Sequence, residues 1–456
     1  MGEAEGNLSF CVSRVVKITQ LYEECESIVM NSISVAIKGK GLFNFLRRTV
    51  TIAKRYGGNA ELMDCALAQF VSVLHHFGCS ATFPITSVAL ARNPKVITKY
   101  QEQGIEFAIH GYRHLDHSQL PLSEQAAELT LAKQVFAKAG IQPRGFRGPY
   151  LRWNSDTLAV LQQQGLSYDA SPGLAWDVLD GNQSAGYRQA LNFYRALSAN
   201  DYPSLPSLRG NLVSIPYSLP DDEALVERLT LRTSPQMSAL WLAILQRTYE
   251  LGELFVIGLH PERFPLCRAP LEAVLEETRR LMPAVWIARL DEIDAWWRTR
   301  ITTLVSATDT SDGKLHMSVS GPSGVTVLIR HAEVDAYTRP WADAYHLLES
   351  RAFTVSARTK PLVGLSPTSS PRLADFLRQQ GYIVEIGTDR QLYSYYFDEA
   401  QFTPEQERSI LSQIEGAPLP LVRLGRWPNG ARSAVAITGD IDALTLWDYG
   451  LRFLGR

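Results

Sequence analysis

Hydrophobic and polar positions alternate from Arg48 onwards in a pattern that predicts strands and helices in turn. Short β-branched or apolar runs predict strands, and apolar spacings of three and four predict helices. The predicted strands are 49–53, 79–85, 106–109, 213–215, 254–259 and 285–288. The predicted helices are 62–77, 93–103, 123–139, 154–164, 234–251, 271–282 and 290–297. This alternation is typical of an α/β fold with a parallel sheet, either open or closed into a barrel.

Three further regions differ from this alternating pattern. Residues 1–41 carry weak periodicity and predict an N-terminal extension, which places the barrel region at 42–302. Residues 303–425 begin with a stretch rich in Ser, Thr, Asp and Gly, a linker or β-meander, and continue with predicted strands at 325–329 and 381–385 and a helix at 370–380. They predict a smaller second domain, α/β or β-rich, of unknown role. Residues 426–456 again contain a strand-like run.

Composition and charge narrow the classes of function. The 456 residues carry a net charge of −2, so no basic surface predicts a nucleic-acid partner. The five cysteines are scattered without a CxxC pair, which is typical of free thiols in a reducing compartment. The sequence has no basic-then-apolar leader and no apolar run near the roughly 18 residues of a membrane span. These features predict a cytoplasmic protein without an integral membrane segment.

The first candidate for chemistry is a pair of histidines after the strand 106–109. His110 and His114 lie four residues apart, and on one helical turn their imidazoles could bind a single cation. Two surface histidines in a loop are the structural alternative. The pair therefore needs support from other motifs.

Two further motifs also follow predicted strands. The sequence FRGPY at 146–150 predicts a rigid turn that presents Arg147, because Pro149 fixes its own φ. A buried guanidinium of this kind could hold a neighbouring carboxylate base ionised. His260 ends the strand 254–259, where a histidine can serve as a general acid or base. A well-made turn and a hydrogen-bonded structural histidine are the alternatives.

Taken in this order, the motifs resemble those of the polysaccharide deacetylase family, carbohydrate esterase family 4, also defined by NodB homology. The resemblance covers about residues 48–295. It includes 78–83, similar to the family's second strand, and 168–177, where the family has a hydrophobic-plus-Asp motif. Gly258 replaces the leucine that opens the family's LxH motif. The resemblance implies a deacetylase-type distorted (β/α) barrel.

One family motif is missing from its usual place. The family carries a catalytic aspartate and a metal-ligand aspartate directly after the first strand, where this chain has Ala53 and Lys54. The C-terminal run 434–445 instead resembles that motif, with Asp440 and Asp442 as an Asp-x-Asp pair. We therefore expect the C-terminal strand to dock into the barrel and supply both carboxylates. A truncated duplicate domain or an exposed turn are the alternatives, and docking into a neighbouring chain would serve equally well.

The resemblance also implies a metal site and a base. His110, His114 and Asp442 are expected to bind a divalent metal ion, zinc above all. Asp440, paired with Arg147, is expected to deprotonate the attacking water. The roles of the two aspartates could be exchanged.

The remaining implied roles concern the oxyanion and the leaving group. The backbone N–H of Tyr150 is expected to stabilise the oxyanion together with the metal. His260 is expected to protonate the leaving amine. Asp169 or Asp177 is the expected partner that orients His260.

The function predicted from the sequence is metal-dependent removal of N-acetyl groups from an amino-sugar glycan or its precursor. Trp153 and Trp176 are the expected stacking platforms for a sugar ring, whereas His117 is expected to face solvent. Two alternatives stay open. One is a catalytically inactive, glycan-binding relic of the fold, and the other is an amidohydrolase acting on a different C–N bond. The sugar and the oligomeric state are not determined by the sequence.

Overall fold

The computed structural model describes residues 55–178, 187–188, 191–452 and 454. The chain divides into two compact units, residues 1–57 and residues 58–456. Almost all described residues belong to the second unit. The predicted extension 1–41 and the predicted strand 49–53, together with Ala53 and Lys54, lie outside the described residues.

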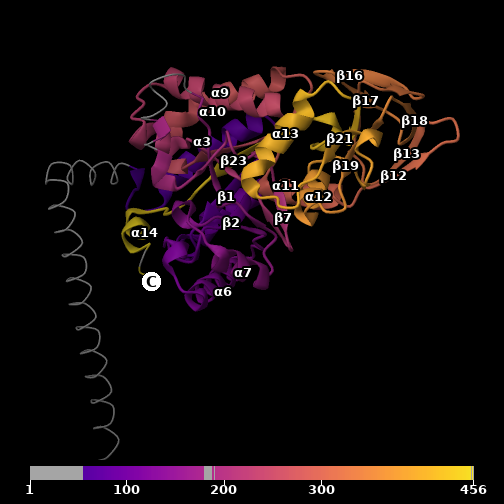
Figure 1. Ribbon diagram of the computed structural model, residues 1–456. Coiled ribbons are helices and arrows are strands. Elements are labelled where there is room, and N and C mark those ends of the chain that lie inside the picture. Colours follow the sequence, from indigo (N-terminus) through magenta and orange to yellow (C-terminus); the bar gives the residue numbers. More distant parts are fainter. Residues whose placement is uncertain (1–54, 179–186, 189–190, 453, 455–456) are drawn as a thin grey trace, which may run out of the picture. The chain divides into compact units, whose positions relative to one another are not determined.

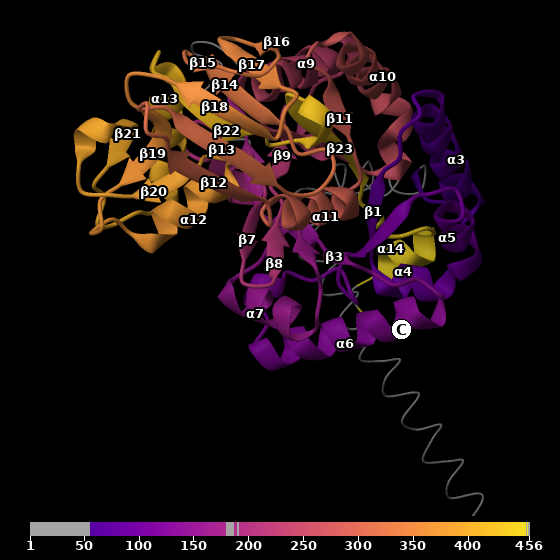
Figure 2. The ribbon, with the colours of Figure 1, turned by 90° about the vertical axis from the view of Figure 1, so that its right-hand side faces the viewer.

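A curved, mainly parallel sheet forms the centre of the second unit (Figures 1 and 2). Its strands pair in the order β10, β23, β1, β2, β3, β4, β8, β7, and β11 pairs with β23. Their bounds are β1 Thr82–Ile85, β2 Glu106–Ile109, β3 Gly145–Phe146, β4 Tyr168–Asp169, β7 Ser207–Arg209, β8 Leu212–Ser214, β10 Leu254–Leu259, β11 Val285–Ile287 and β23 Ser433–Gly439. No pairing joins β7 to β10 among the described strands, so the sheet curves without closing.

Helices alternate with these strands along the chain and pack against the sheet. They are α3 Glu61–His76, α4 Ser87–Arg92, α5 Pro94–Gln101, α6 Leu122–Lys138, α7 Ser155–Gln163, α9 Ser234–Leu251, α10 Phe264–Arg280, α11 Leu290–Arg300 and α14 Leu446–Leu451. In both views α6 lies beside α7 and α9 lies beside α10 (Figures 1 and 2). Within the described part of the chain, no helix has the length and apolar character of a membrane span.

A small parallel sheet lies against β10. Its strands are β5 Gly173–Ala175, β6 Leu197–Ser198 and β9 Tyr217–Leu219, with β5 in the middle. The Val256 backbone N–H of β10 donates to Ser218 Oγ of β9 at 3.2 Å. The predicted fold class is confirmed: an α/β fold with a distorted, incompletely closed barrel and additional β-rich structure.

The C-terminal strand β23 lies in the interior of the main sheet. It pairs in parallel with β10 from Leu254↔Ala434 to Leu259↔Gly439, and with β1 at Thr82↔Thr438. All seven of its residues are buried. In Figures 1 and 2 the yellow β23 runs among strands that come from much earlier parts of the chain.

Backbone hydrogen bonds fix the chain beyond the end of β23 as well. The Asp440 N–H donates to the Leu259 carbonyl at 2.8 Å, and the Ile441 N–H donates to the Pro84 carbonyl at 2.8 Å. The Thr86 N–H donates back to the Ile441 carbonyl at 3.1 Å. Backbone hydrogen bonds to both neighbouring strands, β10 and β1, therefore fix the residues around the Asp-x-Asp pair.

Most predicted elements lie where the pattern places them, and two differ. The helix predicted at 271–282 is α10, which begins at Phe264 because Pro265 occupies its first turn, where the missing N–H costs nothing. The segment from His110 to His114 is a loop and not a helical turn. Gly111 within it has a φ of +79°, a left-handed conformation that interrupts a helix.

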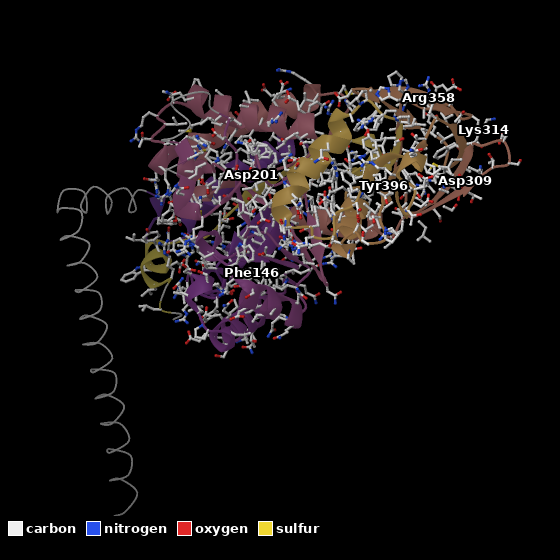
Figure 3. All side chains as sticks on the ribbon, viewed as in Figure 1. Phe146, Asp201, Asp309, Lys314, Arg358 and Tyr396 are labelled. Atoms are coloured by element: carbon white, nitrogen blue, oxygen red, sulfur yellow. The ribbon has the colours of Figure 1, made fainter. Side chains whose placement is uncertain are left out.

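Residues 303–425, here called the accessory region, are β-rich. Three sheets have the orders β12-β13-β18-β15, β16-β17-β14-β22 and β20-β19-β21. The strands are β12 Leu304–Asp309, β13 Leu315–Ser320, β14 Val327–Arg330, β15 Glu333–Val334, β16 Thr338–Ala342, β17 Tyr345–Leu348, β18 Ala352–Ser356, β19 Lys360–Leu365, β20 Val384–Ile386, β21 Tyr393–Phe397 and β22 Leu421–Leu424, and the helices are α12 Pro371–Gln379 and α13 Glu407–Gly416. The predicted linker or meander at 301–320 contains the β12–β13 hairpin, marked by Asp309 and Lys314 in Figure 3.

The interior position of β23 predicts a large effect of shortening one of its side chains. Ile437 is fully buried, so Ile437→Ala is expected to lower the free energy of unfolding by about 2–5 kcal/mol. Leu304→Ala, at a side chain that is 73% exposed, is the control and should cost less than about 0.5 kcal/mol. Urea unfolding measures both. A loss at Ile437 as small as that at Leu304 would contradict a central β23.

Candidate active site

Four parallel strands end at one edge of the sheet, and each is followed by a residue that the sequence singles out. His110 follows β2, Arg147 follows β3, His260 follows β10, and Asp440 follows β23. Barrels of alternating strands and helices carry their chemistry at this edge. The fold thus brings together residues that are up to 330 positions apart, such as His110 and Asp440.

His110, His114 and Asp442 form a compact cluster at this edge. Their potential ligand atoms all lie within 4.8 Å of one another. Asp442 Oδ1 is 3.5 Å from His110 Nε2 and 3.2 Å from His114 Nε2. His110 Nδ1 lies 2.8 Å from the Arg147 carbonyl oxygen, which can only accept a hydrogen bond. Nδ1 of His110 therefore carries the hydrogen, and Nε2 presents its lone pair to the cluster.

This cluster fits a divalent metal ion. Asp442 Oδ1 is buried and has no hydrogen-bond partner among the described residues, so a cation there would satisfy it. Burial lowers the pKa of His114 although the nearby Asp442 raises it, and a neutral imidazole is the form that binds metal. Two imidazoles and one carboxylate are a donor set suited to zinc. Three protein ligands would leave a coordination position of the ion open for water or substrate.

Arg147 and Asp440 form a buried ion pair. Arg147 Nη1 lies 2.6 Å from Asp440 Oδ1 and 2.9 Å from Thr438 Oγ1. Its Nε donates to the Ala170 carbonyl at 3.2 Å, and its guanidinium carbon lies 4.5 Å from the centre of the Tyr217 ring. Arg147 is 0% exposed, so its charge depends on Asp440 for compensation. Removing one member of such a pair typically costs about 3–5 kcal/mol.

Gly258, where the resembling family has leucine, makes room for Tyr217. A Cβ atom at position 258 would lie 1.6 Å from Tyr217 Oη. That hydroxyl donates to Asp221 Oδ2 at 2.9 Å, and the ring of Tyr217 packs on Arg147. Glycine at position 258, where the family has leucine, therefore leaves room for the Tyr217 ring that packs on Arg147.

The partner of His260 is Asp222, so the prediction of Asp169 or Asp177 for this place is wrong. His260 Nδ1 lies 2.7 Å from Asp222 Oδ1, and the His260 backbone N–H donates to Oδ2 at 2.7 Å. Burial alone lowers the pKa of His260, but the charge and hydrogen bond of Asp222 raise it well above its ordinary value. His260 is therefore protonated at neutral pH.

Sequence reasoning missed Asp222 for a local reason. It lies 38 positions before His260 and just after β9, a strand of three residues that is too short to show a period. The sequence marks the place only by three consecutive acidic residues, Asp221 to Glu223. Acidic runs of this kind usually lie on the surface, whereas Asp222 is fully buried.

Asp169 instead supports the turn that carries Arg147. Its Oδ1 accepts from the Ser171 N–H at 3.1 Å and from Ser171 Oγ at 2.5 Å. Ser171 Oγ in turn accepts from the Gly148 N–H at 2.8 Å. Burial raises the pKa of Asp169 to about 6 although these hydrogen bonds lower it. Asp177 lies 3.5 Å from Arg188 Nε.

The two predicted stacking platforms, Trp153 and Trp176, and the predicted oxyanion donor Tyr150 have different surroundings. Tyr150 is 36% exposed, and its ring centre lies 4.5 Å from that of His114. Trp153 is half-buried. Trp176 is only 3% exposed, so the prediction of a stacking platform there is wrong, because a buried ring offers no face to a sugar.

His117 is also buried, contrary to the expectation that it faces solvent. It is 2% exposed, and its ring centre lies 5.2 Å from that of Phe146. Its Nε2 atom has no hydrogen-bond partner among the residues that the structure describes. Burial lowers the pKa of His117 to about 4, so its ring is neutral beside the cluster of His110, His114 and Asp442.

Helix α14 holds the Asp442 segment against the barrel. Asp448 accepts hydrogen bonds from Arg92 Nη1 at 3.2 Å and from Asn93 Nδ2 at 2.9 Å. The Arg452 carbonyl accepts from the His114 N–H at 3.1 Å, and Arg452 Nη1 donates to Asp442 Oδ2 at 3.2 Å. The end of the chain thus orients both the carboxylate and one histidine of the cluster.

Comparison with known proteins identifies the segment that carries most of these motifs. The model of the polysaccharide deacetylase family matches residues 59–168, which include His110, His114, Arg147 and Tyr150 and end before β23. A peptidoglycan deacetylase-like protein of Gibberella zeae, FGM2, is 32% identical over 120 residues, which are 23% of this chain and 32% of that protein.

Two further similarities concern the same kind of protein. A chitooligosaccharide deacetylase of Bradyrhizobium sp. strain ANU 289 is 31% identical over 99 residues, 21% of this chain and 45% of the relative. The chain therefore spans less than half the length of either curated relative. The crystal structure of a probable polysaccharide deacetylase from Pseudomonas aeruginosa PAO1 is 20% identical, covers 51% of this chain and 73% of its own, and has a TM-score of 0.41.

The His260–Asp222 pair predicts a pH dependence of stability. A raised pKa in the folded protein means that the pair stabilises fully below the ordinary histidine pKa of about 6.5, and that this contribution is lost as the pH rises through the folded value. In Asp222→Asn, burial dominates and the pKa of His260 should fall below its ordinary value. Histidine NMR titration measures it. Asp177→Asn is the control and should leave the titration unchanged, and an unaffected His260 in Asp222→Asn would contradict the pairing.

Proposed function

We propose that this chain, whose residues 59–168 match the polysaccharide deacetylase family, removes N-acetyl groups from an amino-sugar glycan or its precursor by metal-dependent hydrolysis. The observation that carries the proposal is the position of Asp440 and Asp442. The last strand brings one carboxylate to Arg147 and the other to His110 and His114. The segment that matches the family model thereby gains the two carboxylates that it lacks.

The proposed metal ligands are His110, His114 and Asp442, with zinc as the expected ion. The chemistry that such an ion supplies is polarisation of the acetamide carbonyl and acidification of the attacking water. Arg452 supports this assignment because it holds the second oxygen of Asp442 and leaves the first directed at the histidines.

The protein groups divide the proton transfers between them. Asp440, oriented by Arg147, whose guanidinium also donates to Thr438, accepts a proton from the water that attacks the carbonyl carbon. The backbone N–H of Tyr150 donates to the oxyanion that forms. His260, protonated through its pairing with Asp222, donates to the amine as the C–N bond breaks, and the products are acetate and a free amino sugar.

Metal binding tests the first part of this proposal. Elemental analysis of the intact protein should find about one zinc per chain, and Asp442→Ala should weaken metal affinity by about 10–100-fold or more, because it removes one of three protein ligands. Asp375→Ala is the matched control, since its exposed carboxylate pairs with Arg378 on the same helix, far from the histidines in sequence. Equal metal content in all three proteins, or none in the intact protein, would contradict the site and favour the inactive glycan-binding relic.

Catalysis tests the second part. Acetate release from N-acetylglucosamine oligomers should fall about 10²–10⁴-fold in His260→Asn, because the leaving amine loses its proton donor, while metal content stays unchanged. His75→Asn changes an exposed histidine and is the control. Metal binding without acetate release from any amino-sugar oligomer would instead support hydrolysis of another C–N bond.

A cytoplasmic location, which the sequence predicts, is part of the proposal.

A further inference from the structure

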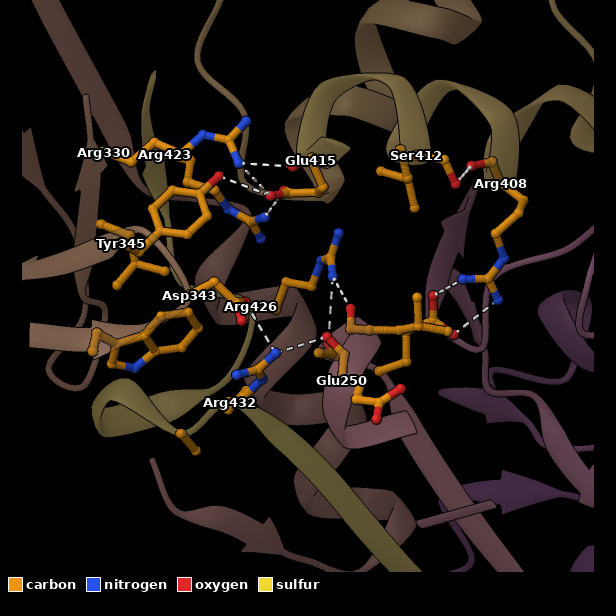
Figure 4. A pocket seen from close by; sticks show the side chains of 17 residues that line it. Glu250, Arg330, Asp343, Tyr345, Arg408, Ser412, Glu415, Arg423, Arg426 and Arg432 are labelled. Atoms are coloured by element: carbon orange, nitrogen blue, oxygen red, sulfur yellow. Dashed lines mark hydrogen bonds and ion pairs between the residues drawn. The ribbon is translucent and has the colours of Figure 1, made fainter. Parts of the chain in front are cut away.

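A cavity of about 190 Å³ lies between the accessory region and the C-terminal end of α9 (Figure 4). Arginines dominate its polar lining. They are Arg330 of β14, Arg408 of α13, Arg423 of β22, and Arg426 and Arg432 from the segment between β22 and β23. Four carboxylates also line it, so positive groups exceed negative ones by one. Neither the His110–His114–Asp442 cluster nor the His260–Asp222 pair lies in this cavity.

Each of the four carboxylates already pairs with an arginine other than Arg426. The pairs are Glu415 with Arg330 and Arg423, Glu253 with Arg408, Asp343 with Arg432, and Glu250 with Arg247. The charge of Arg423 and Arg426 lowers the pKa of Glu415 to about 2 although burial raises it, so this carboxylate is ionised. All four carboxylates that line the cavity are therefore neutralised by arginines other than Arg426.

Arg426 is the cation without a carboxylate. It is 6% exposed, and its Nη1 donates to the carbonyls of Leu251 and Gly252 at 2.9 and 3.5 Å. Its Nε is buried without a partner, and its Nη2 donates to none of the described residues. Figure 4 shows this guanidinium in the middle of the cavity, with its free edge turned away from the two carbonyls.

A charge held in this way is poorly compensated. Carbonyl dipoles at a helix end carry only part of a charge, and a buried cation without a counter-ion is costly. Burial lowers the pKa of Arg426 and the charge of Arg423 lowers it further, although Tyr382, Glu415 and Glu253 raise it. An anion in the cavity would relieve both effects.

Arg432 offers a second set of donors beside Arg426. Its Nε and Nη2 donate to the carbonyls of Tyr249 and Glu250, each at 2.9 Å, and its Nη1 has no partner among the described residues. The two guanidinium groups therefore rest on consecutive carbonyls of α9 with donors left over. Both guanidinium groups line the cavity, and planar forks of donors suit the several oxygens of a phosphate group better than a single-point anion.

We propose that this cavity binds a phosphate group, either free or as the monoester of a small molecule. The rings of Trp341 and Tyr345, whose centres are 6.2 Å apart, line the same cavity and could contact the organic part of an ester. The cavity adjoins the start of β23, whereas Asp440 follows its end. Seven residues of strand separate the two, about 23 Å, so this site is distinct from the deacetylase site.

Phosphate binding is measured directly on the full chain by isothermal titration calorimetry. Inorganic phosphate should bind, while chloride at equal ionic strength should give no saturable heat. Arg426→Gln should weaken binding at least about tenfold, the equivalent of roughly 1.4 kcal/mol. Glucosamine 6-phosphate is the second probe, and tighter binding than inorganic phosphate would identify a monoester as the ligand.

A second variant keeps the test decisive if Arg426→Gln does not fold. Ser412 is an exposed residue of α13 that lines the cavity, so Ser412→Glu supplies the missing carboxylate next to Arg426. Ser412→Glu should raise the thermal unfolding midpoint in phosphate-free buffer. Phosphate should raise the midpoint of the unchanged protein but not that of Ser412→Glu. Gln413→Glu is the matched control, since it adds the same charge at an exposed neighbour outside the cavity.

Two results would overturn the proposal. One is the absence of saturable phosphate binding to the intact protein. The other is phosphate binding that is the same in Ser412→Glu and Gln413→Glu. Neither readout depends on bound metal or on acetate release, so the outcome is independent of the proposed deacetylase activity.

Discussion

The parallel register between β23 and β10 determines where Asp440 and Asp442 of the candidate site lie. Side chains on a strand alternate between two faces, and Thr438, Asp440 and Asp442 follow one another at intervals of two. The first two contact Arg147, and the third reaches the histidine cluster. A slip of the pairing by one residue would turn all three side chains to the opposite face. The Arg147–Asp440 ion pair and the His110–His114–Asp442 cluster therefore depend on one alignment of backbone hydrogen bonds.

The sequence predicts those parts of the structure that depend on long periodic patterns or on shared strand ends. Helix α9 and strand β10 lie at the predicted bounds, and the residues that follow β2, β3, β10 and β23 meet as expected. The errors have local or tertiary causes. The left-handed Gly111 interrupts the expected helical turn, and β9 is too short to reveal Asp222. The burial of Trp176 depends on packing between distant segments, which no local pattern records.

The segment that precedes β23 has a structural role of its own. Arg426, Trp427 and Arg432 donate to the carbonyls of residues 249–252 at the end of α9, where a helix lacks backbone donors for its last carbonyls. The same segment leaves the accessory region at β22 and enters the main sheet at β23. It therefore joins the accessory region to the strand that positions Asp440 and Asp442, and the arginine-lined cavity lies at this junction.

The late position of β23 in the chain also affects biosynthesis. Thr86 and Asp442, which share a hydrogen bond in the folded protein, are 356 positions apart. At about 5–20 residues per second, a ribosome needs roughly 20–70 s to synthesise the intervening chain. β1 lacks its neighbour β23 throughout that time, and β10 lacks it from its own synthesis onwards; unpaired strand edges are prone to associate with other chains. The main sheet therefore stays incomplete until β23 has been synthesised, and the exposed edges of its earlier strands need protection until then.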